Sequence, residues 1–444
     1  ESIYQRDNNH ASVLLWSCGY ESYGGKVIFE MSQRFRALDG SRPVHYEGIC
    51  HDRSYNATSD IESRMYPPVE EIKAWLAKDR SKPFLCCEYA HAMGNSNGAL
   101  YKYTDLTDTD PSYQGGFIWD YIDQAITKKD RYGREFQAYG GDFDDRPCDY
   151  SFSGNGIVYS RDRDASPKMQ EVKYCYQAVT AEVKRASVLV KNKNLFVSTG
   201  IYDCTAALYR EGVEVLRAPL AADVPPLSQK EYPLPFTVPE TEGEYSVIVS
   251  FALAQDTLWA KKGYEVAFGQ GVFGRFAPPA LPAKAPEAVR GTLNWGAYGA
   301  GFNVIFSKHF RGLVSYRWAG RELLKSIPLP NFWRAPTEND AGNAMACRYG
   351  QWKLASMYVS PHEGSEFSAV LPRYEVQPDA VCVTYTYTLA TNPRAECTLR
   401  WRALGDGTLE GTLHYDPVPG LSEMPEFGVM FQLGADFDRL QWYG

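Results

Sequence analysis

The sequence lacks the long apolar runs and basic blocks that mark two large classes of protein. No hydrophobic stretch approaches the roughly 18 residues that a membrane span requires, so we expect no membrane partner. The 46 Lys and Arg are outnumbered by 54 Asp and Glu, which gives a net charge of −8. Without a basic cluster, nucleic acid is not expected as a partner. Hydrophobic residues make up 44% of the chain, which excludes disorder as its main state.

The ten cysteines include no CxxC pair, so neither a zinc ribbon nor a redox dithiol is indicated. Scattered thiols favour a reducing compartment, and we expect a cytoplasmic protein. The sequence shows no signal peptide. It begins at Glu1 without a methionine, and we expect that its true N-terminus is missing.

What is present indicates several domains. A length of 444 residues suggests about three. Aromatic residues reach 14%, a content that suits both sugar binding and the cores of β-sandwiches.

Residues 1–175 alternate short apolar runs with helical patterns. The runs lie at residues 13–18, 43–47, 62–66, 84–88 and 116–120. Two of the intervening segments carry an apolar helix face, one with Val27, Ile28, Met31, Phe35 and Leu38 and the other with Val69, Ile72, Trp75 and Leu76. This alternation predicts five parallel strands covered by helices. Both an open sheet and the second half of an eight-stranded barrel are consistent with this alternation of strands and helices.

The rest of the chain is rich in strand patterns. Residues 176–275 predict about seven short strands, with a hairpin turning at Glu211 and Gly212, which indicates an immunoglobulin-like sandwich. Residues 276–289 form a proline-rich linker. Residues 290–444 predict part of a larger β-sandwich, which we expect to be incomplete.

Two glutamates stand where parallel α/β folds collect functional groups. Glu21 follows the first apolar run and Glu88 ends the fourth. If the two carboxyls face each other, one can hold a proton while the other stays ionised, as glycoside hydrolysis requires. Alternatively, each glutamate merely ends a strand and faces solvent.

Four other residues lie at the same level of the predicted sheet. His91 is either a histidine at the rim of the core or a donor to a hydroxyl, and Trp119 is either core packing or a platform for a sugar ring. Tyr66 could hydrogen-bond a carboxylate. Asn155 precedes a glycine and is most simply a turn residue.

Several segments resemble glycoside hydrolase family 2. Residues 6–22 are similar to its acid/base signature, and residues 87–96 (CEYAHAMGNS) are similar to the nucleophile signature of its bacterial β-galactosidases. Further matches lie at residues 41–48, 114–120, 139–143, 155–158 and 334–340. The resemblance covers essentially the whole chain. It implies the C-terminal five βα units of a TIM (β/α)8 barrel, an immunoglobulin-like sandwich and part of a large terminal sandwich.

By this resemblance, Glu21 is the general acid/base and Glu88 the nucleophile of a retaining β-galactosidase. Their carboxyl groups are then expected about 5–5.5 Å apart, whereas roughly 9 Å would indicate inversion. Tyr66 would steady the nucleophile.

The resemblance also implies sugar and cation contacts. His91 and Asn155 would address the galactosyl 6-hydroxyl, and Trp119 would lie beneath the sugar. Glu21 would touch a Mg²⁺ whose other ligands lie upstream of this chain. The Phe152 carbonyl and the Asn155 side chain would hold a Na⁺.

Two residues depart from the family pattern. Tyr20 stands where the family has an asparagine that binds the sugar 2-hydroxyl, and Ala11 replaces a proline. Hydrogen bonds to the 2-hydroxyl strengthen in the transition state, so Tyr20 is expected to alter activity or specificity.

Three functions remain open at this point. The first is a β-galactosidase acting on β-galactosides such as lactose, poorly active as this chain alone and assembled as a homo-oligomer or with a chain that supplies the N-terminal half; β-glucuronidase and β-mannosidase are alternatives within the family. The second is a carbohydrate-binding or complementation fragment. The third is a structural protein with a degenerate half-barrel.

Overall fold

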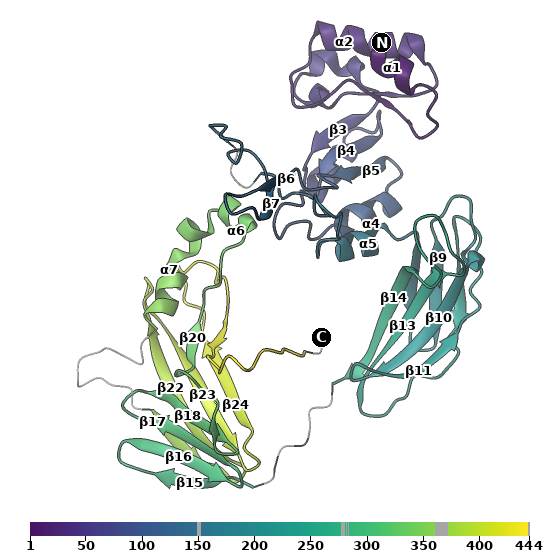
Figure 1. Ribbon diagram of the computed structural model, residues 1–444. Coiled ribbons are helices and arrows are strands. Elements are labelled where there is room, and N and C mark those ends of the chain that lie inside the picture. The colour runs from purple at the N-terminus through teal and green to yellow at the C-terminus, as the bar shows by residue number, and fades with distance from the viewer. Residues whose placement is uncertain (149–151, 277–279, 281, 283, 360–371, 443–444) are drawn as a thin grey trace. The chain divides into compact units, whose positions relative to one another are not determined.

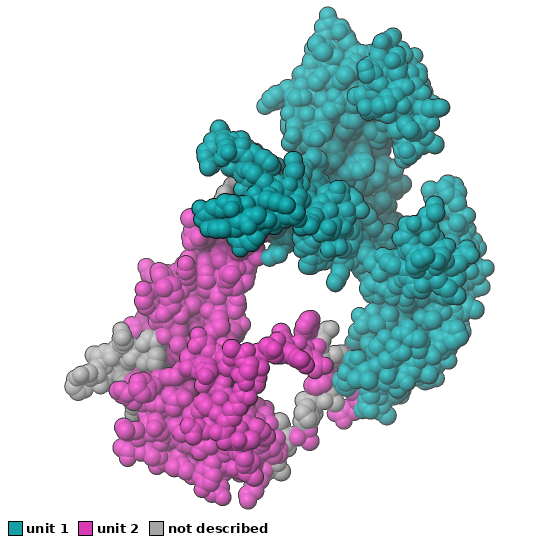
Figure 2. Space-filling model, viewed as in Figure 1, with its two compact units in different colours: residues 1–241, 245–273 teal, residues 242–244, 274–444 magenta. Residues whose placement is uncertain are grey.

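The computed structural model describes residues 1–148, 152–276, 280, 282, 284–359 and 372–442 (Figure 1). These residues form two compact units, residues 1–241 with 245–273, and residues 242–244 with 274–444 (Figure 2). Pro278 and Pro279 of the predicted linker lie outside the described residues. Among the helices that are described, none is both long and apolar enough to cross a membrane.

The first unit begins with the predicted alternation of strands and helices. The five parallel strands are β1 (Trp16–Ser17), β2 (Val44–His45), β3 (Glu62–Met65), β4 (Phe84–Tyr89) and β5 (Tyr113–Ile118). The segments around them contain α1 (Ser2–Asp7), α2 (Lys26–Leu38), η1 (Glu47–Cys50), η2 (Arg53–Thr58), α3 (Val69–Leu76), α4 (Tyr101–Thr109), the hairpin of β6 (Ile126–Lys129) and β7 (Glu135–Ala138), and α5 (Met169–Tyr176).

The five strands are hydrogen-bonded in two groups. β1 pairs with β2, and β3, β4 and β5 form a second sheet in chain order, all of them parallel. Polar bonds connect the groups: Val44 N–H donates to Asp60 Oδ2 at 2.7 Å, Asp60 N–H donates to the Val44 carbonyl at 2.8 Å, and Tyr46 N–H donates to Ser59 Oγ at 3.0 Å. Neighbouring strands therefore follow the order of the chain without a reversal.

The helix faces follow the sequence patterns only in part. On α3, Val69, Ile72 and Leu76 are buried against β4 and β5, as predicted. On α2 the predicted apolar face is wrong, because Val27 is 78% exposed and only Ser32 and Phe35 are buried. Phe35 stacks on Trp16 of β1, so this helix packs through its C-terminal half.

A seven-stranded sandwich completes the first unit. One sheet has the order β11 (Val213–Pro219), β10 (Tyr202–Arg210), β13 (Gly243–Leu253) and β14 (Glu265–Arg275), and the other has β12 (Ser228–Pro233), β9 (Ser187–Asn192) and β8 (Val179–Val183). A short helix, η3 (Thr199–Ile201), precedes β10. The predicted hairpin is confirmed, since Arg210 pairs with Val213 across the turn. Both turn residues have positive φ, as two-residue hairpin turns favour.

The second unit is mostly antiparallel sheet. Its strands are β15 (Glu287–Arg290), β16 (Asn294–Gly299), β17 (Phe302–Ser307), β18 (Gly312–Trp318), β19 (Arg321–Glu322), β20 (Leu329–Asn331), β21 (Arg373–Val376), β22 (Ala380–Leu389), β23 (Ala395–Leu404), β24 (Leu409–Tyr415) and β25 (Gly428–Met430), with helices α6 (Glu338–Gly342) and α7 (Met345–Met357). One core joins the β15–β19 and β21–β24 sheets. The first strand, β15, begins within the predicted linker.

Candidate active site

A cavity of about 400 Å³ lies at the C-terminal ends of the parallel strands of the first unit. Its wall is made of Tyr20, Glu21, Tyr66, Glu88, His91, Trp119 and Phe152. These side chains come from segments at the ends of β1, β3, β4 and β5 and from the segment before α5. The structure therefore brings seven of the eight residues singled out from the sequence into one place.

Glu88 lies near the end of β4 and is only 9% exposed. Burial is the main cause that raises the pKa of its carboxyl, and the nearby charges of Glu21 and Glu47 raise it further. Tyr66, directly after β3, opposes this shift because its hydroxyl donates to Glu88 Oε2 at 2.5 Å. Burial in turn raises the pKa of Tyr66, which keeps its phenol a donor. Glu88 is thus a buried carboxylate held by one strong hydrogen bond.

Glu21 lies in the loop after β1, with its backbone in the left-handed region at φ 54°. Its N–H donates to Glu47 Oε2 at 3.3 Å. The Glu21 side chain lines the same cavity as Glu88 and Tyr66, and its charge raises the pKa of both. The alternative that each glutamate merely ends a strand and faces solvent is wrong for Glu88, which is buried, whereas Glu21 is exposed and lines the same cavity.

Aromatic rings surround the two carboxylates. The His91 ring meets Tyr66 edge-on with centroids 5.8 Å apart, and it lies 6.1 Å from the Phe152 ring. Burial lowers the pKa of His91, and the Asp120 charge opposes that shift. His91 is thereby favoured as a neutral imidazole, able to exchange hydrogen bonds with a hydroxyl.

Asn155 is the one predicted site residue that does not line the cavity. It is fully buried, and its amide group lies between two neighbours: in the amide orientation that satisfies both, Nδ2 donates to the Ser153 carbonyl at 3.0 Å and Oδ1 accepts from Trp119 Nε1 at 2.9 Å. Its carbonyl also accepts from Asp120 N–H at 2.9 Å. The simple turn expected from the Asn-Gly pair is therefore wrong, because tertiary bonds to the end of β5 determine the position of Asn155.

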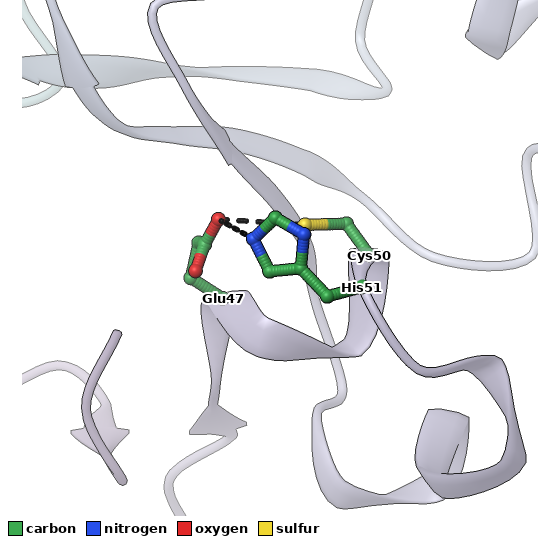
Figure 3. Close-up of side chains that lie close together, drawn as sticks. All are labelled: Glu47, Cys50 and His51. Atoms are coloured by element: carbon green, nitrogen blue, oxygen red, sulfur yellow. Dashed lines mark hydrogen bonds and ion pairs between the residues drawn. The ribbon is translucent and has the colours of Figure 1, made fainter. Parts of the chain in front are cut away.

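The described residues do not by themselves complete the expected cation sites. Glu21, the expected Mg²⁺ ligand, belongs to no group of three potential ligands in the described part of the chain. For Na⁺, the amide oxygen of Asn155 already accepts the Trp119 indole. Of the residues described, three potential metal ligands converge at one place, Glu47, Cys50 and His51, whose ligand atoms lie within 4.8 Å of one another (Figure 3).

Glu47 was missed as a functional residue in the sequence, where it ends the second apolar run. It is buried at the start of η1, directly behind the Glu21 loop. A charged residue that ends a buried strand is a weak signal by itself. No pattern in the sequence indicates that Glu47 bonds a backbone 26 residues earlier.

Two acidic side chains that share a cavity at the ends of parallel strands, one of them bonded to a tyrosine, are typical of glycoside hydrolases built on a parallel barrel. Comparison with protein families gives the same class. The model described as glycosyl hydrolases family 2, TIM barrel domain, matches residues 1–181, that for β-galactosidase, domain 4, matches residues 188–273, and that for the β-galactosidase small chain matches residues 298–444. The chain belongs to glycoside hydrolase family 2, with a TIM-barrel domain and β-sandwich domains.

Individual relatives support this assignment over the full length of the chain. The β-galactosidase of Halalkalibacterium halodurans is 46% identical over 451 residues, covering 100% of this chain and 43% of the relative. That of Clostridium acetobutylicum is 43% identical, covering 100% and 48%. The β-galactosidase large subunit of Latilactobacillus sakei is 51% identical over 175 residues, covering 39% and 28%. The chain spans less than half the length of these relatives.

Proposed function

We propose that this chain carries both catalytic carboxylates of a retaining β-galactosidase. The observation that supports this most directly is the single cavity shared by Glu21 and Glu88. The relatives that match the whole chain are themselves named β-galactosidases, which favours galactose over the glucuronic acid or mannose that other family 2 enzymes accept.

In the proposed reaction, Glu88 and Glu21 act in two displacements. Glu88 attacks C1 of the galactosyl group while Glu21 protonates the departing glycosidic oxygen, which leaves a galactosyl ester on Glu88. Glu21 then takes a proton from a water that attacks C1, the ester bond breaks, and galactose leaves with its configuration retained. A carboxyl separation of about 5–5.5 Å stays a prediction of this scheme.

The remaining residues of the cavity are proposed to contact either the nucleophile or the sugar. Tyr66 steadies Glu88 through the hydrogen bond already described, and Trp119 offers its face to the apolar side of galactose. His91 is proposed to address the 6-hydroxyl. Asn155 acts on the same region by fixing the Trp119 indole, while its direct contact with the sugar stays a prediction.

The complete enzyme is proposed to contain three further βα units that close the barrel on the five described here. Mg²⁺ at Glu21 and Na⁺ at Phe152 and Asn155 belong to the same proposal, because the oxygen ligands missing here would have to come from elsewhere in the enzyme. We expect the isolated chain to hydrolyse β-galactosides poorly. Its cytoplasmic location also stays a prediction.

A multi-subunit enzyme is the second candidate organisation. The Latilactobacillus sakei relative, which matches part of this chain, is named a large subunit. Residues 298–444 match the family model of a β-galactosidase small chain. Co-expression with a chain supplying the N-terminal half, followed by affinity purification through one tag, tests it. Recovery of both chains with galactosidase activity is expected if the barrel is completed in trans.

The catalytic assignment is tested in the complete enzyme by trapping the covalent intermediate. A 2-deoxy-2-fluorogalactoside with a good leaving group is expected to add one fluorogalactosyl group to the peptide that contains Glu88, as read by mass spectrometry. Glu88→Gln should abolish the label. Glu70→Gln, an exposed carboxylate on α3, should retain it.

Two results would contradict this proposal. One is label on a different carboxylate, and the other is release of α-galactose as the first product in an NMR time course. Parallel assays with aryl β-glucuronide and β-mannoside separate the alternative specificities, since faster turnover of either one would overturn the choice of galactose.

A further inference from the structure

Glu47 is a buried carboxylate that the proposed chemistry leaves without a role. It is 3% exposed, yet it does not line the cavity. A buried charge is costly unless hydrogen bonds satisfy it, so the partners of Glu47 indicate what it holds in place.

One carboxylate oxygen of Glu47 bonds the backbone of the proposed acid/base. Oε2 accepts the Glu21 N–H at 3.3 Å, and the Glu47 N–H donates to the Gly19 carbonyl at 3.4 Å. The side chain and the backbone of one residue therefore hold the loop at two points. Because φ is positive at Glu21, its backbone is in a conformation that is unfavourable for a non-glycine residue and persists only where surrounding contacts enforce it.

The other oxygen is fixed from the opposite side. Cys50 Sγ donates to Glu47 Oε1 at 3.4 Å, and His51 Nε2 lies 3.5 Å from the same oxygen (Figure 3). Both partners belong to the turn that Glu47 itself begins, η1 and the residue after it. One carboxylate oxygen of Glu47 thus contacts its own turn while the other accepts the Glu21 N–H, so both oxygens have partners.

The residues beside Glu47 hold the same loop. The Tyr46 hydroxyl lies 2.7 Å from Ser22 Oγ and within 3.0 Å of the Ser22 carbonyl and 3.1 Å of the Tyr23 carbonyl. A Cβ at Gly48 would lie 2.3 Å from the Ser22 carbonyl oxygen, so only glycine permits this approach. Three consecutive residues therefore form a support beneath the segment that carries Glu21.

We propose that Glu47 is a positioning residue, which holds the Glu21 loop in the conformation that aims the Glu21 carboxyl at the glycosidic oxygen. This inference rests on the proposed function, because it gives Glu47 a role only through the acid/base. Without Glu47 the Glu21 N–H loses its acceptor, the loop relaxes from the left-handed conformation, and protonation of the leaving group suffers while attack by Glu88 does not.

The test uses leaving-group dependence in the complete enzyme. An acid catalyst matters for a poor leaving group such as phenol and little for 2,4-dinitrophenol, which departs without a proton. Acid–base catalysis is typically worth about 10²–10⁴-fold. For Glu47→Ala we expect kcat/KM on phenyl β-galactoside to fall by about 100-fold, and on the dinitrophenyl galactoside by less than about fivefold.

Two further variants identify the hydrogen bond as the cause. Glu47→Gln keeps an oxygen that can accept the Glu21 N–H, so it should recover most of the activity on the phenyl substrate. Glu62→Ala removes another buried carboxylate, which is bonded to Arg53 and not to the Glu21 loop. This control should lower thermal stability and affect both substrates equally.

The outcomes separate this inference from the function on which it rests. If Glu21→Ala shows the leaving-group dependence and Glu47→Ala lowers both rates equally, the positioning role is wrong and the acid/base assignment stands. If Glu21→Ala itself shows no such dependence, the acid/base assignment fails first. In a Glu21→Ala background, adding Glu47→Ala should cost nothing more on the phenyl substrate; an additional loss would contradict the proposed route through Glu21.

Discussion

Replacing Tyr66 by phenylalanine removes the one hydrogen bond that opposes the raised pKa of Glu88. The hydroxyl donates to Glu88 Oε2 at 2.5 Å and favours the ionised carboxylate. A hydrogen bond to a charged group contributes about 1.5–3 kcal/mol. Tyr66 is 40% exposed, so the lower end applies. Ionised Glu88 should therefore lose about 1.5 kcal/mol of stabilisation in Tyr66→Phe, and its pKa should rise.

The sign of the effect on activity follows from the nucleophile role proposed for Glu88. A nucleophile must be ionised, so activity is lost as the pH falls through its pKa. A higher pKa therefore moves the acidic limb of the kcat/KM profile to higher pH. The profile is measured on an aryl β-galactoside with the complete enzyme. Tyr101→Phe, on α4 and outside the cavity, should leave the limb unmoved. An unmoved limb in Tyr66→Phe, or one moved to lower pH, would refute the reasoning.

Three further predictions address specificity, the loop and stability. Tyr20→Asn should raise kcat/KM on β-galactosides about tenfold, because the asparagine can hydrogen-bond the sugar 2-hydroxyl. It should bring no gain on 2-deoxygalactosides, and equal gains on both substrates would contradict a role for that hydroxyl. Gly48→Ala should lower kcat at least about tenfold because its Cβ would meet the Ser22 carbonyl at 2.3 Å, whereas Gly40→Ala, with open space around it, should not. Phe251→Ala, in the sandwich core, should lower the free energy of unfolding measured in urea by about 3–5 kcal/mol. Phe196→Ala, at an exposed position, should lower it by about 0.5 kcal/mol or less.

The parallel strands could be predicted because buried strands leave continuous apolar runs. All five runs contain or overlap a strand, although the first strand is only Trp16–Ser17. Strand β13, in the predicted sandwich, shows the other visible period, because Val247, Val249 and Phe251 alternate with less buried residues and are fully buried. These features depend on a period within one segment, and a period is visible in a sequence.

Features that depend on partners distant in the chain could not be predicted. The role of Asn155 follows from Trp119, 36 residues earlier, whereas its neighbour Gly156 suggested only a turn. Glu47 follows α2 in the chain, yet it bonds the Glu21 loop, which precedes that helix. A period cannot reveal such contacts, and a family signature records the reacting residues more readily than their supports.

The division of the parallel strands into two bonded groups has a consequence for the chemistry. Glu21 lies in the loop after β1, in the β1–β2 group, and Glu88 lies near the end of β4, the middle strand of the other group, so their separation is a distance between two groups of strands. The bonds that Asp60 and Ser59 accept from Val44 and Tyr46 join the two groups. Since inverting glycosidases keep their two carboxyls farther apart than retaining ones, to leave room for a water, loosening this junction is the change with which a test of the proposed retaining geometry would begin.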